Sequence, residues 1–117
     1  MPMIIESAFA MLACARLGAV HSVVFGGFSP KELANRIDNC EPNLIVTSSM
    51  GIEPNKHIPY PPIVEEALNE HCAWPKAATL PRLIKQRNEL DGSLRAEGLD
   101  RKLYKDYDEL MNETTEV

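Results

Sequence analysis

Residues 21–30, HSVVFGGFSP, decide how the rest of the chain is interpreted. The stretch passes from β-branched residues into a Gly-Gly pair and then into a helix start signal. Ser29, Pro30 and Glu32 form the capping box S-x-x-E, with proline at the first helical position. A strand, a glycine turn and a capped helix in this order are typical of the carboxyl edge of a parallel sheet, where open α/β sheets bind ligands. A tight turn that binds nothing is the competing interpretation.

The glycine turn has two properties that suit a nucleotide. Gly26 and Gly27 lack a Cβ, so a ring or a phosphate can approach their backbone closely. The helix that begins at Pro30 presents free N–H groups and the positive end of its dipole to the same place. The turn is therefore a candidate binding element.

Two helices and two strands are predicted around this turn. A helix over residues 4–17, stopped by Gly18, is apolar on two faces and so needs cover on two sides. A β-branched strand over 19–24, a helix over 30–39 and a strand over 43–47 follow. Strand, helix and strand at this spacing predict a right-handed βαβ unit with parallel strands, in which the first helix stays exposed on one side.

The remainder of the chain is less regular. Residues 48–62, SSMGIEPNKHIPYPP, are predicted to be irregular because they hold four prolines and a glycine. They are either an exposed connector or a second ligand-binding loop at the same sheet edge. A helix is predicted over 63–71, a short edge strand at 83–84, a loop over 89–100 and a terminal helix over 103–112.

Composition excludes several classes of protein. The chain of 117 residues is 44% apolar and carries a net charge of −5, which argues against nucleic acid and anionic membrane as partners. Its uncharged runs are far shorter than the ~20 residues that a bilayer requires, and no basic residue precedes them as in a signal peptide. Cys14, Cys40 and Cys72 are too far apart for a C-x-x-C motif, so we expect reduced thiols.

Catalytic and metal-binding patterns are not found in the sequence. It has no phosphate-binding G-x-x-x-x-G-K-[ST] loop, and His57 and His71 have no matching acid or cysteine at a zinc spacing. The Glu65-Glu66 pair and residues 106–109 are predicted to be solvated faces. We therefore assign no catalytic residue and no metal ligand.

The first 70 residues resemble a known family. The run MPMIIESAFAMLACARLGAVHSVVFGGFSPKELANRIDNCEPNLIVTSS closely resembles the N-terminal domain of the AMP-forming short-chain acyl-CoA synthetases, the acetyl- and propionyl-CoA synthetase group. The stretches GIEP and IPYPPIVEEAL resemble the propionyl-CoA synthetase branch more than the acetyl-CoA synthetase branch. Over residues 72–117 only KLYKDYDELM resembles the family.

The resemblance implies a fold and a reaction. The chain would be an α/β fragment, residues 1–117, of the large N-terminal domain of adenylate-forming enzymes, with a partial parallel sheet that is incomplete in isolation. Residues 1–71 would be its well-matched part, and residues 72–117 a polar, poorly matched tail. Such enzymes join a carboxylate to ATP, releasing pyrophosphate, and then pass the acyl group to CoA.

The resemblance also implies a CoA site. Carried over by position, the residues that would line the CoA nucleotide are Phe25, Gly26, Gly27, Glu53, Lys56 and Ile58. The family commonly has arginines at the positions of Glu53 and Lys56. Lys56 keeps the charge without the guanidinium fork, whereas Glu53 reverses its sign.

The chain alone is not expected to catalyse the reaction. The ATP-gripping loop, the Mg²⁺ and ATP contacts and the catalytic lysine of the family would lie in regions absent here. Expected partners are the rest of the synthetase chain, CoA and acetate or propionate, in the cytoplasm or the mitochondrial matrix. A small non-catalytic nucleotide-binding or regulatory α/β domain, and an inert truncated gene product, remain alternatives.

Overall fold

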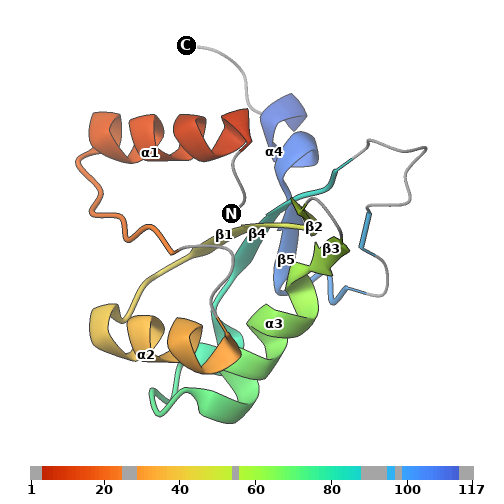
Figure 1. The fold of residues 1–117 in the computed structure, drawn as a ribbon. Helices are drawn as coiled ribbons and strands as arrows, with labels where there is room; N and C mark the ends of the chain where they lie inside the picture. Colours follow the sequence, from red (N-terminus) through yellow and green to blue (C-terminus); the bar gives the residue numbers. More distant parts are fainter. Residues whose placement is uncertain (1–3, 25–28, 54–55, 88–94, 97–98, 114–117) are drawn as a thin grey trace.

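Three parallel strands form the centre of the structure. Strands β1 (Ile45–Ser48), β4 (Arg82–Lys85) and β5 (Tyr104–Asp106) lie in the order β1-β4-β5, with Ile45 opposite Arg82 and Arg82 opposite Tyr104 (Figure 1). The α/β class with a partial parallel sheet is confirmed. The structure is a computed structural model, and it describes residues 4–24, 29–53, 56–87, 95–96 and 99–113.

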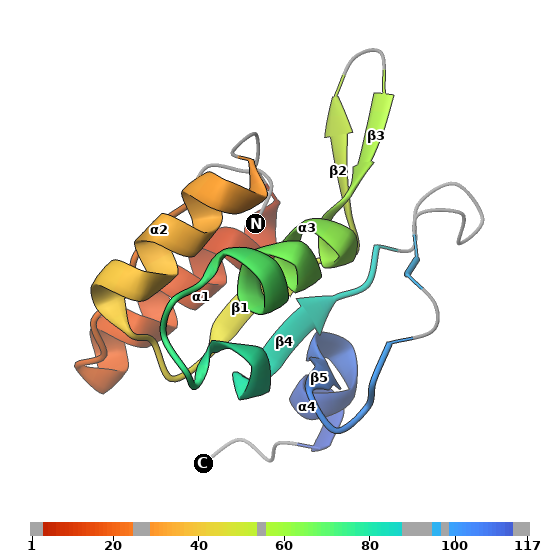
Figure 2. The same cartoon turned by 90° about the horizontal axis from the view of Figure 1, so that it is seen from below.

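Helices cover the two faces of this sheet unequally. Helices α2 (Pro30–Cys40) and α3 (Tyr60–Glu66), the latter continued by the π-helical turn η1 (Ala67–His71), lie on one face, while α1 (Ile5–Leu17) and α4 (Tyr107–Glu113) lie on the other (Figures 1 and 2). The buried apolar cluster lies on the α2 and α3 side and consists of Ile37, Val64, Leu68, Ala77 and Leu80. Burial of this cluster supplies the main apolar contribution to stability.

Helix α1 forms where it was predicted but finds little cover. Gly18 ends it with a left-handed φ of 72°, a conformation that glycine adopts without penalty. None of its residues is buried, and Phe9 and Leu12 are 49% and 63% exposed. The prediction that the first helix stays exposed is therefore confirmed.

The strand predicted over residues 19–24 is wrong. These residues have no regular secondary structure, and the side chain of Val20 is fully exposed. A β-branched run becomes a strand only where a neighbour accepts its backbone hydrogen bonds. No described strand of this chain does so for residues 19–24, and the βαβ unit expected around α2 lacks its first strand.

The second and third helices follow their local signals. Ser29 Oγ accepts a hydrogen bond from Glu32 N at 3.3 Å, so the predicted N-cap of α2 is confirmed. Helix α3 begins at Tyr60, three residues earlier than predicted. Pro61 and Pro62 fit in its first turn because the N–H groups there have no helical partner in any case.

Two predictions for the second half of the chain are wrong. Residues 82–85 form the central strand β4 rather than an edge, because β5 pairs with its far side. The terminal helix predicted over 103–112 is divided into β5 and α4. Asp106 ends the strand and caps the helix, since its Oδ1 accepts a hydrogen bond from Glu109 N at 3.1 Å.

A buried polar contact fixes α3 to the sheet. The fully buried guanidinium of Arg82 lies 3.4 Å from the Glu65 carboxylate, which accepts a 2.7 Å hydrogen bond from the Tyr104 hydroxyl. Burial, followed by that hydrogen bond, raises the pKa of Tyr104. Glu65 was predicted to be solvated; its side chain is 40% exposed and in addition pairs with Arg82 and Tyr104. A carboxylate beside a buried arginine offsets part of the cost of burying its charge.

Candidate functional site

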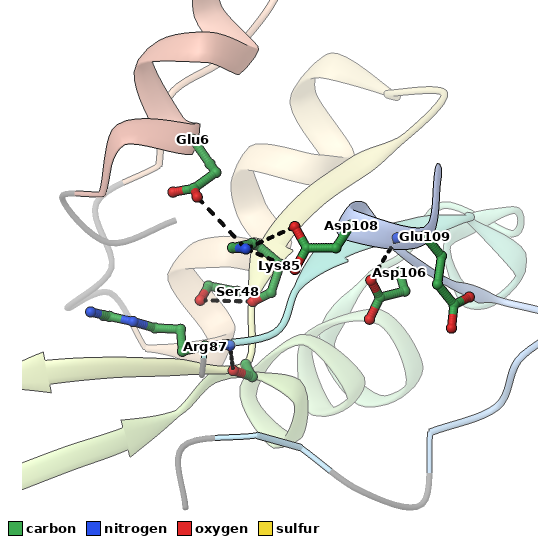
Figure 3. Close-up of polar contacts among 8 residues, drawn as sticks. Glu6, Ser48, Lys85, Arg87, Asp106, Asp108 and Glu109 are labelled. Carbon is green, nitrogen blue, oxygen red and sulfur yellow. Dashed lines mark hydrogen bonds and ion pairs between the residues drawn. The ribbon is translucent and has the colours of Figure 1, made fainter. Parts of the chain in front are cut away.

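The carboxyl ends of β1 and β4 lie side by side and are tied by polar groups. Ser48 Oγ and Ser49 N donate hydrogen bonds to the carbonyl of Lys85 at 3.2 and 3.0 Å. Ser49 Oγ in turn accepts one from the backbone N–H of Arg87 at 2.9 Å (Figure 3). Both serines are fully buried. The two strand ends are thereby held at the edge where parallel sheets bind ligands.

A β-hairpin rises from this edge, where an irregular loop was predicted. Strands β2 (Met50–Glu53) and β3 (Lys56–Pro59) are antiparallel and project from the body of the molecule (Figure 2). The prediction of an irregular loop was wrong because it considered the number of prolines and not their positions. Pro59 is the last residue of β3, at the end of an edge strand, so it does not interrupt the ladder; Pro54 lies outside the described residues.

The base of the hairpin depends on a glycine. A Cβ added to Gly51 would lie 2.5 Å from the hydroxyl oxygen of Tyr60, and the Tyr60 ring is buried. The backbone N–H of Tyr60 also donates to the carbonyl of Ser49 at 3.3 Å. The start of α3 therefore packs against the hairpin and sets its direction.

The predicted CoA residues divide into two groups. Phe25, Gly26 and Gly27 lie outside the described residues. Glu53 and Lys56 occupy opposite positions next to the hairpin turn, and Ile58, opposite Gly51 in β3, is partly exposed. The hairpin thus brings the two charged positions together and carries Ile58 on the same projecting element.

Sequence reasoning missed the ionic cluster beside this edge. Lys85 Nζ lies 2.8 Å from both carboxylate oxygens of Asp108 and 3.7 Å from Glu6 Oε1, and it lies 5.9 Å from the centre of the Tyr107 ring (Figure 3). Burial alone would lower the pKa of Lys85, but the hydrogen bond and charge of Asp108 outweigh it and raise the pKa. Asp108 was predicted to be solvated, because no local pattern reveals a partner 23 residues away.

Two other features bear on the chemistry that this chain can perform. A pocket of about 340 Å³ lies along β5 and α4, lined by residues that include Arg101, Lys105, Asp106 and Glu113. Among the described residues no three His, Cys, Asp or Glu side chains are placed to hold a metal ion.

The thiols and the apolar helices are two further features of the chain. Cys14, Cys40 and Cys72 are all free, and Cys40 is exposed. In the part of the chain that the structure describes, no helix has the length and apolarity to cross a bilayer.

Comparison with known proteins gives a consistent result. The family model described as "AMP-binding enzyme" matches residues 1–112. Over 68 residues, 58% of the chain, it is 59% identical to the mitochondrial acyl-CoA synthetase short-chain family member 3 of Bos taurus and 57% identical to that of Homo sapiens. Over 71 residues, 61% of the chain, it is 52% identical to an acetyl-coenzyme A synthetase of Pseudoalteromonas atlantica.

These matches cover a small part of each relative. The chain spans 10% of the bovine and human proteins and 11% of the bacterial one. One family accounts for the parallel sheet, the hairpin at its carboxyl edge and the match over nearly the whole sequence. The chain belongs to the AMP-binding enzyme family, and within it to the part shared with AMP-forming short-chain acyl-CoA synthetases.

Proposed function

We propose that this chain contributes one wall of the CoA nucleotide site in an AMP-forming short-chain acyl-CoA ligase. The observation that supports this best is the hairpin β2–β3, which leaves the carboxyl edge of the parallel sheet and holds Glu53 opposite Lys56. A nucleotide needs an apolar wall and cations for its phosphates, and this edge is where α/β sheets bind such ligands.

The wall has an apolar part and a charged part. Phe25, Gly26 and Gly27 would line the adenine, with Ile58 packing nearby, and the bare glycine backbone would allow close approach. Lys56 would meet a CoA phosphate as a point charge. Glu53 would weaken that attraction, so the pair gives the hairpin tip no net charge.

The acid substrate would be acetate or propionate. The relatives that support this include an acetyl-coenzyme A synthetase and a short-chain acyl-CoA synthetase. The reaction would consume the carboxylate, ATP and CoA and yield acyl-CoA, AMP and diphosphate. Residues 1–71 would form the well-matched α/β part of this domain segment and residues 72–117 a polar, poorly matched tail.

The chain alone would not perform the adenylation step. That step needs groups that clamp phosphates and stabilise charge as pyrophosphate leaves. The described residues offer no metal-binding trio for Mg²⁺, so we assign no step to a metal here. ATP, Mg²⁺ and the catalytic groups would be held by other parts of the synthetase. A cytoplasmic or mitochondrial matrix location would suit three free thiols.

Two measurements test the proposal. The purified chain should bind CoA, detected by calorimetry, and should not catalyse pyrophosphate exchange with ATP and acetate or propionate. A chimera in which residues 1–112 replace the matching segment of the bovine relative should form acyl-CoA. Exchange by the chain alone would contradict the expected inactivity, and an active chimera with an unchanged KM for CoA after Lys56→Ala would contradict the CoA wall.

The same measurements separate the alternatives. CoA or AMP binding that raises the Tm of the chain, together with an inactive chimera, would favour a small regulatory nucleotide-binding domain, because a ligand of the folded form stabilises by mass action. Aggregation without any ligand response would favour an inert product.

A further inference from the structure

We propose that α1 is a dimer interface, on which a second copy of this chain packs its own α1 in antiparallel orientation. Neither CoA nor the hairpin takes part in this contact, so it is independent of the proposed function. Helix α1 lies at the outer edge of the molecule (Figure 1). Its partly buried positions include Glu6 and Cys14, and all of its exposed residues except Arg16 are apolar. An exposed apolar surface of this kind is typical of an interaction site.

The exposed apolar residues follow the spacing of a contact between two helices. Ile5, Phe9 and Leu12 are all exposed and occupy one stripe of the helix, at steps of four and then three residues. Arg16, four residues further on, is exposed as well and is the last member of the stripe. Steps of four, three and four residues are those of the a and d positions in a coiled coil. The spacing therefore favours another helix as the partner of this stripe.

The stripe is complementary to itself under a two-fold rotation. An isologous contact places residue i of one copy opposite residue j of the other, and j opposite i. In an antiparallel pair centred between Phe9 and Leu12, Phe9 of each copy packs against Leu12 of the other. Ala8 and Ala13 flank this centre, are exposed and also face each other, and their small side chains allow the two helices to approach closely. One helix thus supplies both halves of the interface.

The two charged residues of α1 select the antiparallel orientation. Glu6 lies in the first turn and Arg16 in the last. Parallel helices would place the two Arg16 side chains against each other, whereas antiparallel helices bring Arg16 of one copy to the end that carries Ile5 and Glu6 of the other. The stem of Arg16 can then cover Ile5 while its charged head stays in water. Glu6 belongs with Lys85 and Asp108 to a cluster of net negative charge, which still attracts a cation.

The size of the surface predicts a weak, reversible dimer. The 13 residues of α1 span about 20 Å at ~1.5 Å per residue. A contact of one such helix with another is at the small end of specific interfaces, which typically bury about 800 Å² per partner. Association must also offset the loss of translational and rotational freedom. We therefore expect a Kd on the order of 10 µM rather than an obligate dimer.

Sedimentation velocity of the purified 117-residue chain tests the dimer, at concentrations from about tenfold below to about tenfold above that Kd. The unaltered chain should pass from monomer to dimer over this range. Leu12→Arg should weaken the dimer at least about tenfold, because it places a charge against Phe9 in an apolar contact. Leu17→Arg is the matched control. Leu17 is 82% exposed, more than Leu12 at 63%, but it lies off the stripe, so its replacement should change little.

Disulfide cross-linking tests the orientation. In the antiparallel pair, position 5 of one copy faces position 16 of the other. A mixture of Ile5→Cys and Arg16→Cys should therefore form the mixed disulfide on oxidation, and neither variant alone should cross-link at its new cysteine, because the two Cα atoms of a disulfide lie within about 7 Å. Mass spectrometry of the peptides distinguishes these bonds from any that involve the native thiols.

Several results would overturn the proposal. These are a monomer at every concentration, association that continues beyond the dimer, equal effects of Leu12→Arg and Leu17→Arg, and cross-links of position 5 to 5 or 16 to 16. A monomeric chain whose stripe is shielded from solvent only in the chimera would also overturn it and would assign the stripe to the rest of a synthetase. Circular dichroism of each variant excludes loss of folding as the cause of a change.

Discussion

Lys85 Nζ lies 2.8 Å from both carboxylate oxygens of Asp108, which joins the carboxyl end of β4 to the first turn of α4. Glu6 of α1 lies 3.7 Å from the same nitrogen. One lysine therefore holds the two helices on the poorly covered face of the sheet. Because α1 buries none of its side chains, this ionic contact is a larger share of its attachment than it would be for a well-packed helix.

Asp108→Asn should lower the free energy of unfolding by about 1 kcal/mol or less, because solvent screens a half-exposed pair. The Lys85 and Asp108 side chains are 16% and 43% exposed. Glu109→Gln is the control, since its 3.6 Å pair with Arg101 is exposed on both sides and should contribute nothing measurable. Thermal unfolding followed by circular dichroism compares the two. An equal or larger loss in the control would contradict the assignment.

The same pair predicts a pH dependence. The pKa of Lys85 is raised, because the hydrogen bond and charge of Asp108 outweigh the lowering caused by burial. A lysine with a raised folded pKa contributes stability that is complete below its unfolded pKa of about 10.4 and is lost as pH rises through the folded pKa. As the pH rises from neutral, the difference between Asp108→Asn and the unaltered chain should therefore stay constant up to about pH 10.4 and shrink above it in urea titrations. A difference that vanishes near neutral pH would contradict this cause.

Gly51→Ala should destabilise the chain by about 1–3 kcal/mol, the usual cost of overpacking. The added Cβ would lie 2.5 Å from the Tyr60 hydroxyl oxygen, 2.7 Å from Cζ and 2.9 Å from Cε1 of the same ring. A double-mutant cycle with Tyr60→Ala checks the cause, because removing the ring should remove most of the penalty. Additive losses would show that the glycine is needed for some other reason.

Cys72 should react with thiol reagents more slowly than Cys40 at about pH 8. Burial, and then the charge of and hydrogen bond to Asp38, raise the pKa of Cys72 to about 11, whereas Cys40 is exposed. Asp38 is held beside it by hydrogen bonds from Ala73 N at 3.0 and 3.1 Å and from Trp74 N at 3.1 Å. Labelling with a thiol reagent, followed by mass spectrometry, shows which of the two cysteines reacts first.

The pH dependence of stability provides an independent check on Cys72. A thiol with a raised folded pKa contributes stability that is present below its unfolded pKa of about 8.5 and is lost as pH rises towards the folded value. Cys72→Ser should therefore reduce the fall in stability between about pH 8.5 and the folded pKa of about 11. Faster labelling of Cys72 than of Cys40 would contradict its buried environment.

Glu53→Arg in the chimera should lower the KM for CoA, and Lys56→Ala should raise it by a factor that shrinks as salt increases. Opposite charges ~4 Å apart near a surface interact by a few kcal/mol before screening, so several-fold effects are expected. The KM values for ATP and the carboxylate should hardly change and serve as controls. Equal effects on all three substrates would indicate that the hairpin acts through folding.

The sequence alone determined the elements with local causes. Gly18 predicted the end of α1, and Ser29 with Pro30 predicted the start of α2, because caps and glycine conformations depend on neighbouring residues only. The motif run around the glycine turn also determined the family, which the match over residues 1–112 confirms. The CoA residues themselves remain predictions.

Tertiary structure decided what depends on distant partners. Residues 19–24 have the composition of a strand but no strand beside them, while residues 104–106 became one because Arg82 pairs with Tyr104. Local sequence does not specify a partner 22 residues away. For the same reason the sequence predicts that Asp108 and Glu65 face solvent. Only folding brings Lys85 to Asp108 and the buried Arg82 to Glu65.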